Sequence, residues 1–250
     1  MAFLRLDKYL AQSGEYSRKD AARLVRGGEV RVDSVVRRDP AFKVDPQAQT
    51  VSLQGERVGD HTFQYYLLHK PAGVLTAARD SRTRTVMELV PEALSRRNVL
   101  PVGRLDKDTT GLLLLTNDGG LAHSLLSPKR HVLKEYHVRA EGTLDESDVL
   151  AFAAGMIFSD FTAKSAEMRI LSASAAVSEA IVWLAEGKHH QVKRMFAARG
   201  HPVLCLHRVA FGSLRLPDDL PEGAYRALTA PEVEALREDV LHNAGSLLHP

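Results

Sequence analysis

Four consecutive leucines, Leu112 to Leu115, follow a polar loop in the stretch GRLDKDTTGLLLLTNDGG at residues 103–120. An apolar run of this length, bounded by turn residues, is typical of a strand that is buried on both faces. The polar loop is therefore expected at the edge of a hydrophobic core. An arginine and two aspartates on such a rigid edge suit a functional site, because side chains that do chemistry must be held in place.

The two aspartates of this loop, Asp106 and Asp108, allow several interpretations. Paired carboxylates are the catalytic groups of glycoside hydrolases. Such an enzyme would need aromatic platforms for sugars, whereas this chain has one tryptophan and 6% aromatic residues. Asp108 precedes the turn at residues 109–111, and we expect its carboxylate to brace that turn. Two glycines bracket Asp106, and the loop alone leaves a catalytic and a structural role for it equally open.

The stretch EGKHHQVKRMFAARG, residues 186–200, predicts a strand end, a turn and a helix. Val192 and Phe196 are expected to face the core. Lys193 and Arg194 then lie near the helix start, where a positive charge opposes the helix dipole. This placement predicts an anionic partner for the cations.

Two adjacent histidines, His189 and His190, raise the possibility of a metal site. No His or Cys stands three or four residues after either of them, so we expect no metal there. The single cysteine, Cys205, lies in the apolar run PVLCLH, where a buried and inert thiol is expected. One cysteine cannot form an internal disulfide, and this favours a reducing, cytoplasmic location.

The residues KEY, at positions 134–136, begin another predicted strand. Because side chains alternate along a strand, Lys134 and Tyr136 share one face. Tyr136 by itself is an ordinary half-buried strand tyrosine. It gains functional meaning only if its face lines the cleft that holds Asp106.

Residues 1–43 carry ten Lys or Arg against six Asp or Glu, a net charge of +4, while the rest of the chain carries −2. A small basic module of this kind indicates a polyanionic partner. Its pattern predicts a helix over 4–12, a second helix capped by Ser17, and a hairpin around Asp33-Ser34. The candidate nucleic-acid contacts on this module are Arg18, Lys19, Arg26, Arg37 and Arg38.

From Phe63 onward, predicted strands outnumber helices without a regular βαβ rhythm, which favours an α+β fold with a mixed, mainly antiparallel sheet. A capping box at Thr229 and Glu232 predicts the start of the last helix. No phosphate-binding motif is present, so no nucleotide cofactor is expected. The apolar runs are too short to cross a membrane, and no signal peptide is expected.

The change in pattern near residue 60 predicts two domains. The expected boundaries are residues 1–58 for the basic domain with its linker, 59–240 for the larger domain, and 241–250 for a C-terminal tail.

Several motifs resemble known families. RLDKYLAQSG and SRKDAARLVRGGEVRVD resemble the S4-type RNA-binding domain. GRLDKDTTGLLLLTNDG resembles the signature of pseudouridine synthases that modify ribosomal RNA, and KEY and EGKHHQVKRMF resemble the second and third active-site motifs of that family. The motifs stand in the family's order and cover nearly the whole chain. The resemblance implies a member of the RsuA family, with an N-terminal S4 domain and a pseudouridine synthase catalytic domain.

This resemblance implies an isomerase that converts uridine to pseudouridine without a cofactor or metal. Asp106 would be the essential aspartate, Tyr136 would pack against the target uracil, and Lys193 would pair with Asp106. The target base must leave the RNA stack, since its reacting atoms are inaccessible within it. Further RNA contacts are expected from Arg104, His190 and Arg194.

The form EGKHHQ and the ending HRVAFGSLRLPDDLPEGAYRALT are most similar to the enzymes that act on 16S ribosomal RNA. The resemblance therefore implies a uridine-516-type site in 16S RNA, or in a small-subunit assembly intermediate, and a monomeric enzyme. A uridine in 23S ribosomal RNA is the alternative target. A noncatalytic RNA-binding or ribosome-assembly protein that retains the fold is a third possibility.

Overall fold

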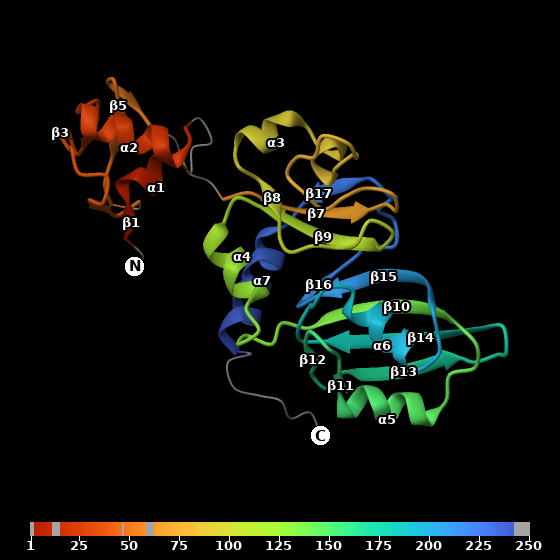
Figure 1. Cartoon of the computed structure of the whole chain (residues 1–250). Coiled ribbons are helices and arrows are strands. Elements are labelled where there is room, and N and C mark those ends of the chain that lie inside the picture. Colours follow the sequence, from red (N-terminus) through yellow and green to blue (C-terminus); the bar gives the residue numbers. More distant parts are fainter. Residues whose placement is uncertain (1–2, 12–15, 47, 59–62, 243–250) are drawn as a thin grey trace. The chain divides into compact units, whose positions relative to one another are not determined.

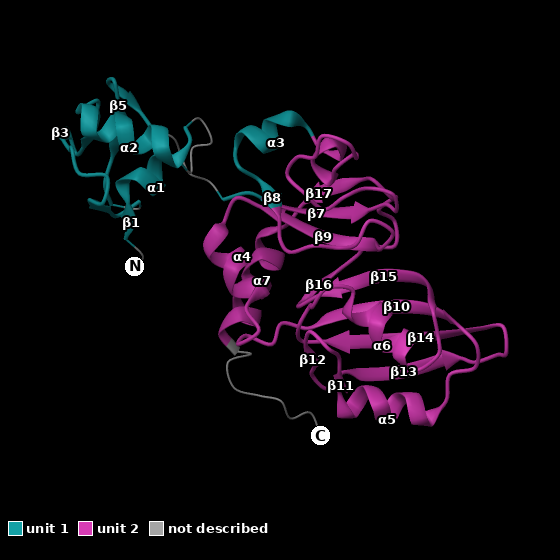
Figure 2. Ribbon diagram, viewed as in Figure 1, with its two compact units in different colours: residues 1–64, 91–100 teal, residues 65–90, 101–250 magenta. Residues whose placement is uncertain are grey.

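The computed structural model describes residues 3–11, 16–46, 48–58 and 63–242. The chain divides into two compact units, one of residues 1–64 and 91–100 and the other of residues 65–90 and 101–250 (Figure 2). We refer to them as the N-terminal unit and, after the domain expected from the sequence, the catalytic unit. The boundaries expected near residues 58 and 240 remain a prediction.

The N-terminal unit contains short helices and two small sheets. Strands β3, β2, β5 and β6 form an antiparallel sheet in that order, and β1 pairs with β4. The elements are β1 (Leu4–Arg5), α1 (Leu6–Ala11), α2 (Arg18–Gly27), β2 (Val30–Val32), β3 (Val35–Val36), β4 (Lys43–Val44), β5 (Val51–Leu53), β6 (Glu56–Arg57) and α3 (Glu92–Arg96). Leu6, Leu10, Val25, Val30 and Val51 are among the residues of its buried core.

The helix expected over residues 4–12 begins only at Leu6, after strand β1, whereas the other local signals of this unit act as the sequence predicts. The hydroxyl of Ser17 accepts a hydrogen bond from the backbone N–H of Asp20 and begins α2. Gly28 ends α2 in the left-handed conformation, with φ 80°. Asp33 and Ser34 both have positive φ, the backbone that a two-residue hairpin turn requires. The expected second helix and hairpin are thereby confirmed.

The catalytic unit is built on a nine-stranded sheet (Figure 1). The main path runs β13-β14-β10-β15-β9-β7-β17, while β16 pairs with β15 and β8 with β9. Neighbours on the main path are antiparallel except β9 and β15, which are parallel. The expected α+β class with a mixed, mainly antiparallel sheet is therefore confirmed. The strands are β7 (Tyr65–Lys70), β8 (Leu100–Pro101), β9 (Thr110–Thr116), β10 (Lys134–Glu141), β13 (Glu167–Ser172), β14 (Val177–Leu184), β15 (Val203–Phe211), β16 (Leu214–Arg215) and β17 (Tyr225–Ala227).

Helices flank this sheet. In Figure 1, α4 and α7 lie side by side, and α5 lies along β13. Asp118 caps α4 through the backbone N–H groups of Gly120 and Leu121, as expected of a turn residue. The remaining elements are η1 (Val86–Leu89), α4 (Gly119–Leu126), α5 (Glu146–Ala154), the hairpin of β11 (Met156–Ile157) and β12 (Thr162–Ala163), α6 (Gln191–Ala198) and α7 (Ala230–His242). The predicted capping box of α7 is present, because Thr229 and Glu232 bond reciprocally.

Strand β9 lies between β7 and β15, and its four leucines are fully buried, as the apolar run predicts. Gly111, at the start of this strand, faces Arg208 of β15. A Cβ atom at Gly111 would overlap the backbone of Arg208, and φ of Gly111 is +105°. Only glycine fits this position, which brings the loop before β9 close to β15.

The expectation of a buried thiol at Cys205 is wrong, because the thiol is exposed. Side chains alternate along β15, so Leu206 and Arg208 are buried while Cys205 points to the accessible side. The apolar neighbours of Cys205 do not reveal this alternation. Among the described residues, no helix is long and apolar enough to span a membrane.

Candidate active site

The loop before β9 and the start of α6 border a solvent-open pocket. Asp106 and Tyr136, which are 30 positions apart in the chain, both line it. The other lining residues are Arg104, Leu105, Thr109, Leu184, Glu186, Gly187, Lys188, His190, Gln191, Val192 and Leu206.

A cluster of charges stands at this pocket. The Nζ atom of Lys193 lies 3.4 Å from Oδ2 of Asp106 and 2.5 Å from Oδ1 of Asp108. The Nε2 atom of His190 lies 3.4 Å from Oδ1 of Asp106. The side chain of Asp106 is 26% exposed and that of Asp108 is 74% exposed. Asp106 is therefore the more sheltered of the two carboxylates, and Lys193 and His190 lie beside it.

The structure corrects the expected role of Asp108. Its carboxylate accepts a hydrogen bond from Lys193, and this bond lowers the pKa of Asp108. The turn is instead closed by the backbone, where the N–H of Thr109 donates to the carbonyl of Asp106 at 3.2 Å. Lys193 and Asp108 come from segments 85 positions apart, so the local sequence gave no sign of this pair.

The first turn of α6 is arranged against the usual preferences of a helix. His190, at the N-cap, has the left-handed φ of 51° and makes no side-chain capping bond. Lys193 stands in the first turn, where the helix dipole disfavours a cation. Asp106 and Asp108 supply the anionic partners that this placement predicts. They lie on the loop of residues 103–109, which we refer to as the catalytic loop. Among the described residues, no group of His, Cys, Asp or Glu could hold a metal ion.

A buried lysine holds the loop from behind. Lys70, the last residue of β7, is fully buried, and its Nζ donates to the carbonyls of Pro71 at 3.0 Å, Lys107 at 3.2 Å and Thr109 at 2.8 Å. Burial lowers the pKa of Lys70 to about 8. The sequence prediction missed Lys70, although a charged residue that closes the apolar strand YYLLHK was a usable signal.

A second brace fixes the other side of Asp106. The hydroxyl of Thr76 donates to the carbonyl of Leu105 at 2.8 Å and accepts from the N–H of Leu105 at 3.2 Å. Thr76 is itself buried. Asp106 thus lies between two backbone segments that are each held by a buried side chain, which limits how far its carboxylate can move.

Glu186 joins two sides of the pocket. Its buried carboxylate accepts from the N–H of Lys164 and from the side-chain amide of Gln191, both at 2.8 Å. Lys164 follows β12, and Gln191 is the first residue of α6. The carboxylate therefore ties the β11–β12 hairpin to the helix that carries Lys193. Sequence reasoning did not single out Glu186 or Gln191.

Tyr136 is 9% exposed, and its face of β10 lines the pocket that holds Asp106. This is the position that the sequence requires of Tyr136 if the residue is to have a function. Lys134, on the same face, is buried and donates from Nζ to the carbonyl of Val132 at 2.6 Å. Burial lowers the pKa of Lys134 to about 8.

The residues predicted to contact RNA near the pocket differ in their surroundings. Arg104 is exposed at the pocket. Arg194 is bound to the carboxylate of Asp160 through two hydrogen bonds of 2.9 and 2.6 Å. Its guanidinium also lies 4.7 and 4.6 Å from the ring centroids of Phe158 and Phe161. Arg194 therefore fixes the β11–β12 hairpin, and an RNA contact would compete with these interactions.

In the N-terminal unit, the predicted RNA contacts Arg18, Lys19, Arg26 and Arg38 are exposed. Arg37 is half-buried, with its guanidinium 4.3 Å from the ring centroid of Phe42. The Nη1 atom of Arg38 donates to the carbonyl of Arg26 at 3.2 Å. The basic surface expected from the sequence is present on this unit, with Arg37 partly withdrawn from it.

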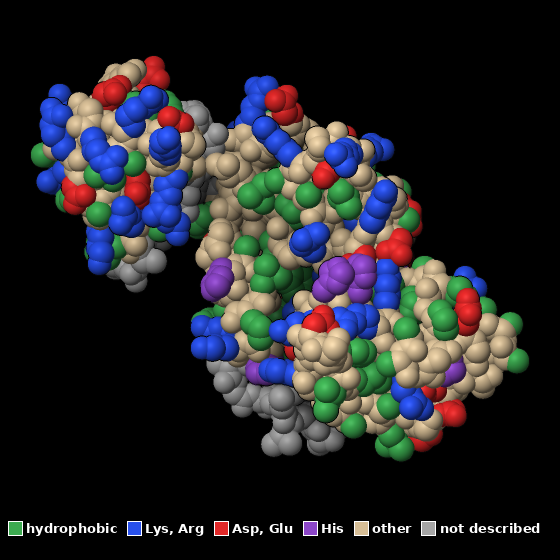
Figure 3. Space-filling model, in the orientation of Figure 1, with side chains coloured by type: hydrophobic (Ala, Val, Ile, Leu, Met, Phe, Trp, Pro, Cys, Tyr) green, Lys and Arg blue, Asp and Glu red, His purple; other side chains and the backbone are tan. Residues whose placement is uncertain are grey.

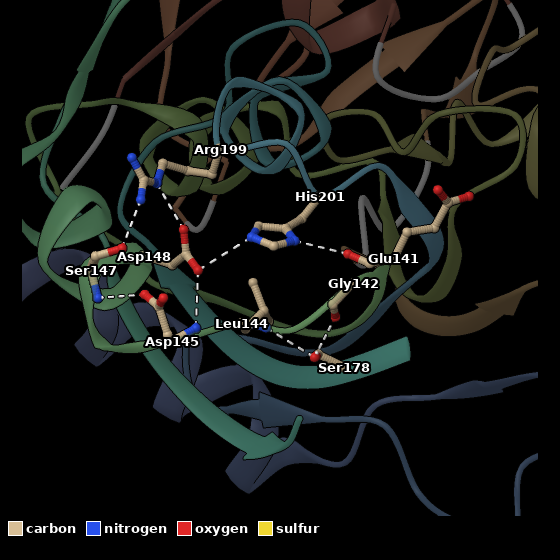
Figure 4. A network of polar contacts seen from close by, with 9 residues as sticks. All are labelled: Glu141, Gly142, Leu144, Asp145, Ser147, Asp148, Ser178, Arg199 and His201. Carbon is tan, nitrogen blue, oxygen red and sulfur yellow. Dashed lines mark hydrogen bonds and ion pairs between the residues drawn. The ribbon is translucent and has the colours of Figure 1, made fainter. Parts of the chain in front are cut away.

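The opposite end of α6 carries a network of polar contacts, shown in Figure 4. The carboxylate of Asp148 is almost fully buried and accepts from Nε of Arg199 at 2.7 Å and from the N–H of Asp145 at 3.0 Å. The Nε2 atom of His201 lies 3.3 Å from the same carboxylate, while its Nδ1 lies 2.9 Å from the carbonyl of Glu141. This network joins the end of α6 to the first turn of α5.

A comparison with protein families identifies both parts of the chain. The RNA pseudouridylate synthase family matches residues 64–198, more than half of the sequence. The chain belongs to this family. The S4 domain matches residues 4–49. The resemblance inferred from the sequence motifs is thereby confirmed for both domains, and the protein is a pseudouridine synthase, an isomerase of RNA uridine.

Individual relatives agree over almost the full length. An uncharacterized RNA pseudouridine synthase of Bacillus subtilis is 42% identical over 94% of this chain and 99% of its own. The ribosomal small subunit pseudouridine synthase A of Pseudomonas aeruginosa is 40% identical over 92% and 99%, respectively. A crystal structure of a pseudouridylate synthase, 33% identical, covers 93% of this chain and 99% of its own with a TM-score of 0.67.

Proposed function

We propose that the protein converts a uridine of small-subunit ribosomal RNA, at a uridine-516-type site, to pseudouridine. The observation that carries the chemistry is the meeting of Asp106 and Tyr136 in one pocket, with Lys193 beside Asp106. The small-subunit target is supported by the relatives named ribosomal small subunit pseudouridine synthase A, which are 40% identical in Pseudomonas aeruginosa and 36% in Escherichia coli.

The reaction breaks the N1–C1′ bond of the target uridine, turns the uracil, and joins C5 to C1′. The C5 proton is lost and N1 regains a proton, so atoms balance without a co-reactant. One carboxylate is enough, because the uracil is both the leaving group and the returning nucleophile. We assign that carboxylate to Asp106, which is sheltered and is held between Lys193 and His190.

Tyr136 supplies a wall of the pocket against which a flipped uracil can pack. Its backbone is held by the sheet on both sides, since β10 lies between β14 and β15, and its side chain is 9% exposed. A rigid aromatic surface positions the base near Asp106 while the glycosidic bond is open. With the base in this position, the Tyr136 side chain lies near C5 of the uracil, from which a proton must leave.

Flipping a base costs unstacking energy, which phosphate contacts elsewhere must offset. We assign such contacts to Arg104 and His190 at the pocket and to the exposed cations of the N-terminal unit. Charge reversal of Lys19 and Arg26 together is expected to reduce the slope of log Kd against log salt by roughly 1.5, as for two lost phosphate contacts. An unchanged slope would contradict a role of the N-terminal unit in RNA binding. We also propose that the enzyme is a monomer, and sedimentation of the protein tests this.

The direct test is to map pseudouridine in ribosomal RNA from cells that lack this protein and from cells complemented with the wild type. The proposal predicts loss of one pseudouridine in the small-subunit RNA and its return on complementation. Loss of a large-subunit pseudouridine would show that the same reaction takes place on 23S RNA. If every pseudouridine remains, the proposed activity is wrong, and a noncatalytic role in binding RNA is the alternative.

A further inference from the structure

A second hollow of the catalytic unit lies outside the pocket of Asp106. It is a solvent-open recess. It is formed by the last turn of α4 and the loop that leads to β10. Its lining residues are His123, Ser124, Ser127, Lys129 and Arg130. In Figure 3, Lys, Arg and His side chains are visible over the α4 region of this unit.

The cations of this recess lack acidic partners. In the described part of the chain, no carboxylate forms an ion pair with His123, Lys129 or Arg130. Other cations of the unit are paired, such as Arg194 with Asp160 at 2.6 Å. Cations gathered around a concave surface without a carboxylate create a positive potential there, which attracts an anion.

The recess is close to the catalytic loop. Leu126, the last residue of α4, packs on Gly103. The contact is so close that a Cβ atom at Gly103 would lie 2.7 Å from Cδ2 of Leu126. Gly103 precedes Asp106 by three positions, and three residues of chain span at most about 11 Å. Arg104 stands between them, exposed at the pocket. An RNA strand whose target base enters the pocket can therefore reach the recess with a neighbouring nucleotide.

We propose that this recess binds a backbone phosphate of the substrate RNA beside the target uridine. The inference rests on the proposed function and adds a binding site to it. A guanidinium, an ammonium and two hydroxyl groups are the donors that phosphate oxygens accept from, and they recognise no particular base. The recess thereby extends the positive surface from the pocket, through Arg104, along the RNA backbone.

A purely structural role predicts something different. Basic residues near a helix C-terminus stabilise the helix through its dipole. If this were their whole function, replacing Lys129 and Arg130 would lower the stability of the protein and leave RNA binding unchanged. A binding measurement together with a thermal melt therefore separates the two roles.

The test uses the full chain with the double variant Lys129→Glu/Arg130→Glu. A control, Arg139→Glu/Arg169→Glu, makes the same charge change on strands β10 and β13, and it also removes the ion pair of Arg139 with Glu179. Binding to an unmodified transcript of small-subunit ribosomal RNA is measured at several salt concentrations. For active protein, KM and kcat are measured on the same transcript.

We expect the recess variant to lower the slope of log Kd against log salt by roughly 1.5 relative to the control, and to raise KM roughly tenfold with kcat nearly unchanged. The effect should be the same when the bases that flank the target are changed, because phosphates carry no sequence information. Equal slopes for recess variant and control would overturn the inference. Failure of the proposed function would show separately, as absence of pseudouridine with the wild-type protein.

Discussion

The two ends of α6 carry similar residues in opposite settings. At the N-terminal end, His190 and Lys193 stand beside the carboxylates of the catalytic loop, partly exposed and opposed by the helix dipole. At the C-terminal end, Arg199 and His201 surround the buried Asp148, where the dipole favours cations. One end leaves room for a substrate, whereas the other is closed by its own contacts.

The N-terminal end of α6 therefore carries residues of the proposed active site, whereas the C-terminal end contributes to stability. The left-handed φ of His190 is a conformation that costs a non-glycine residue energy, and such strain is tolerated where the surrounding structure holds it in place. The network of Asp148 contributes to holding α6 in place, because it anchors the C-terminal end of α6 to α5. The contacts at the C-terminal end thus stabilise α6, and a stable α6 holds His190 and Lys193 in place at its N-terminal end.

The largest expected effect on stability comes from Asp148→Ala. The substitution leaves Arg199 and His201 without their common buried partner, and we expect a loss of about 3 kcal/mol in the free energy of unfolding. For a chain of this size, the corresponding fall in Tm is roughly 10 °C. The control is Asp160→Ala, whose carboxylate is 59% exposed and should matter by less than about 1 kcal/mol. Equal losses in the two variants would show that the C-terminal network has no special weight.

The next effect concerns activity at the functional end. Lys193→Met keeps most of the length of the unbranched side chain but removes the cation beside Asp106, so we expect kcat to fall roughly 100-fold with little change in Tm. Asp108→Asn serves as the control, because it breaks the closest contact of Lys193 and leaves Asp106 in place. Its kcat should stay within about threefold of the wild type. A larger loss with Asp108→Asn than with Lys193→Met would move the catalytic carboxylate from Asp106 to Asp108.

A pH effect tests the brace behind the loop. The pKa of Lys70 is about 8 in the folded protein and near its ordinary value of 10.5 when unfolded. The unfolded state therefore binds more protons between these values, and stability contributed by Lys70 rises with pH across this window. The unfolding free energy of wild type minus that of Lys70→Met should increase by roughly 3 kcal/mol between pH 8 and pH 10.5. A difference that stays constant across the window would mean that Lys70 keeps its ordinary pKa.

Much of the fold follows from local patterns in the sequence. The four leucines of β9, the caps of α2 and α7, and the hairpin turn at residues 33–34 were predictable, because each signal lies within a few residues. The orientation of Cys205 was not, since alternation along β15 decides it and an apolar run hides that alternation.

The candidate site was predictable in its central residues and not in its support. Asp106, Tyr136 and Lys193 stand in recognisable motifs, and the structure brings them together. The bonds of Lys70 to the catalytic loop join positions 37 and 39 residues apart, and they depend on the register between β7 and β9. No local pattern encodes such a distance. The pairing of Asp108 with Lys193 has the same origin.

The most direct test is the rate of pseudouridine formation by Asp106→Asn in a single turnover on small-subunit ribosomal RNA, with RNA affinity and Tm measured on the same preparation. We predict a rate at least about 1,000-fold below the wild type, because the carboxylate to which we assign the reaction is lost. RNA affinity should remain nearly unchanged, and stability should stay within about 1 kcal/mol of the wild type. A rate within tenfold of the wild type would contradict the assignment of the reaction to Asp106.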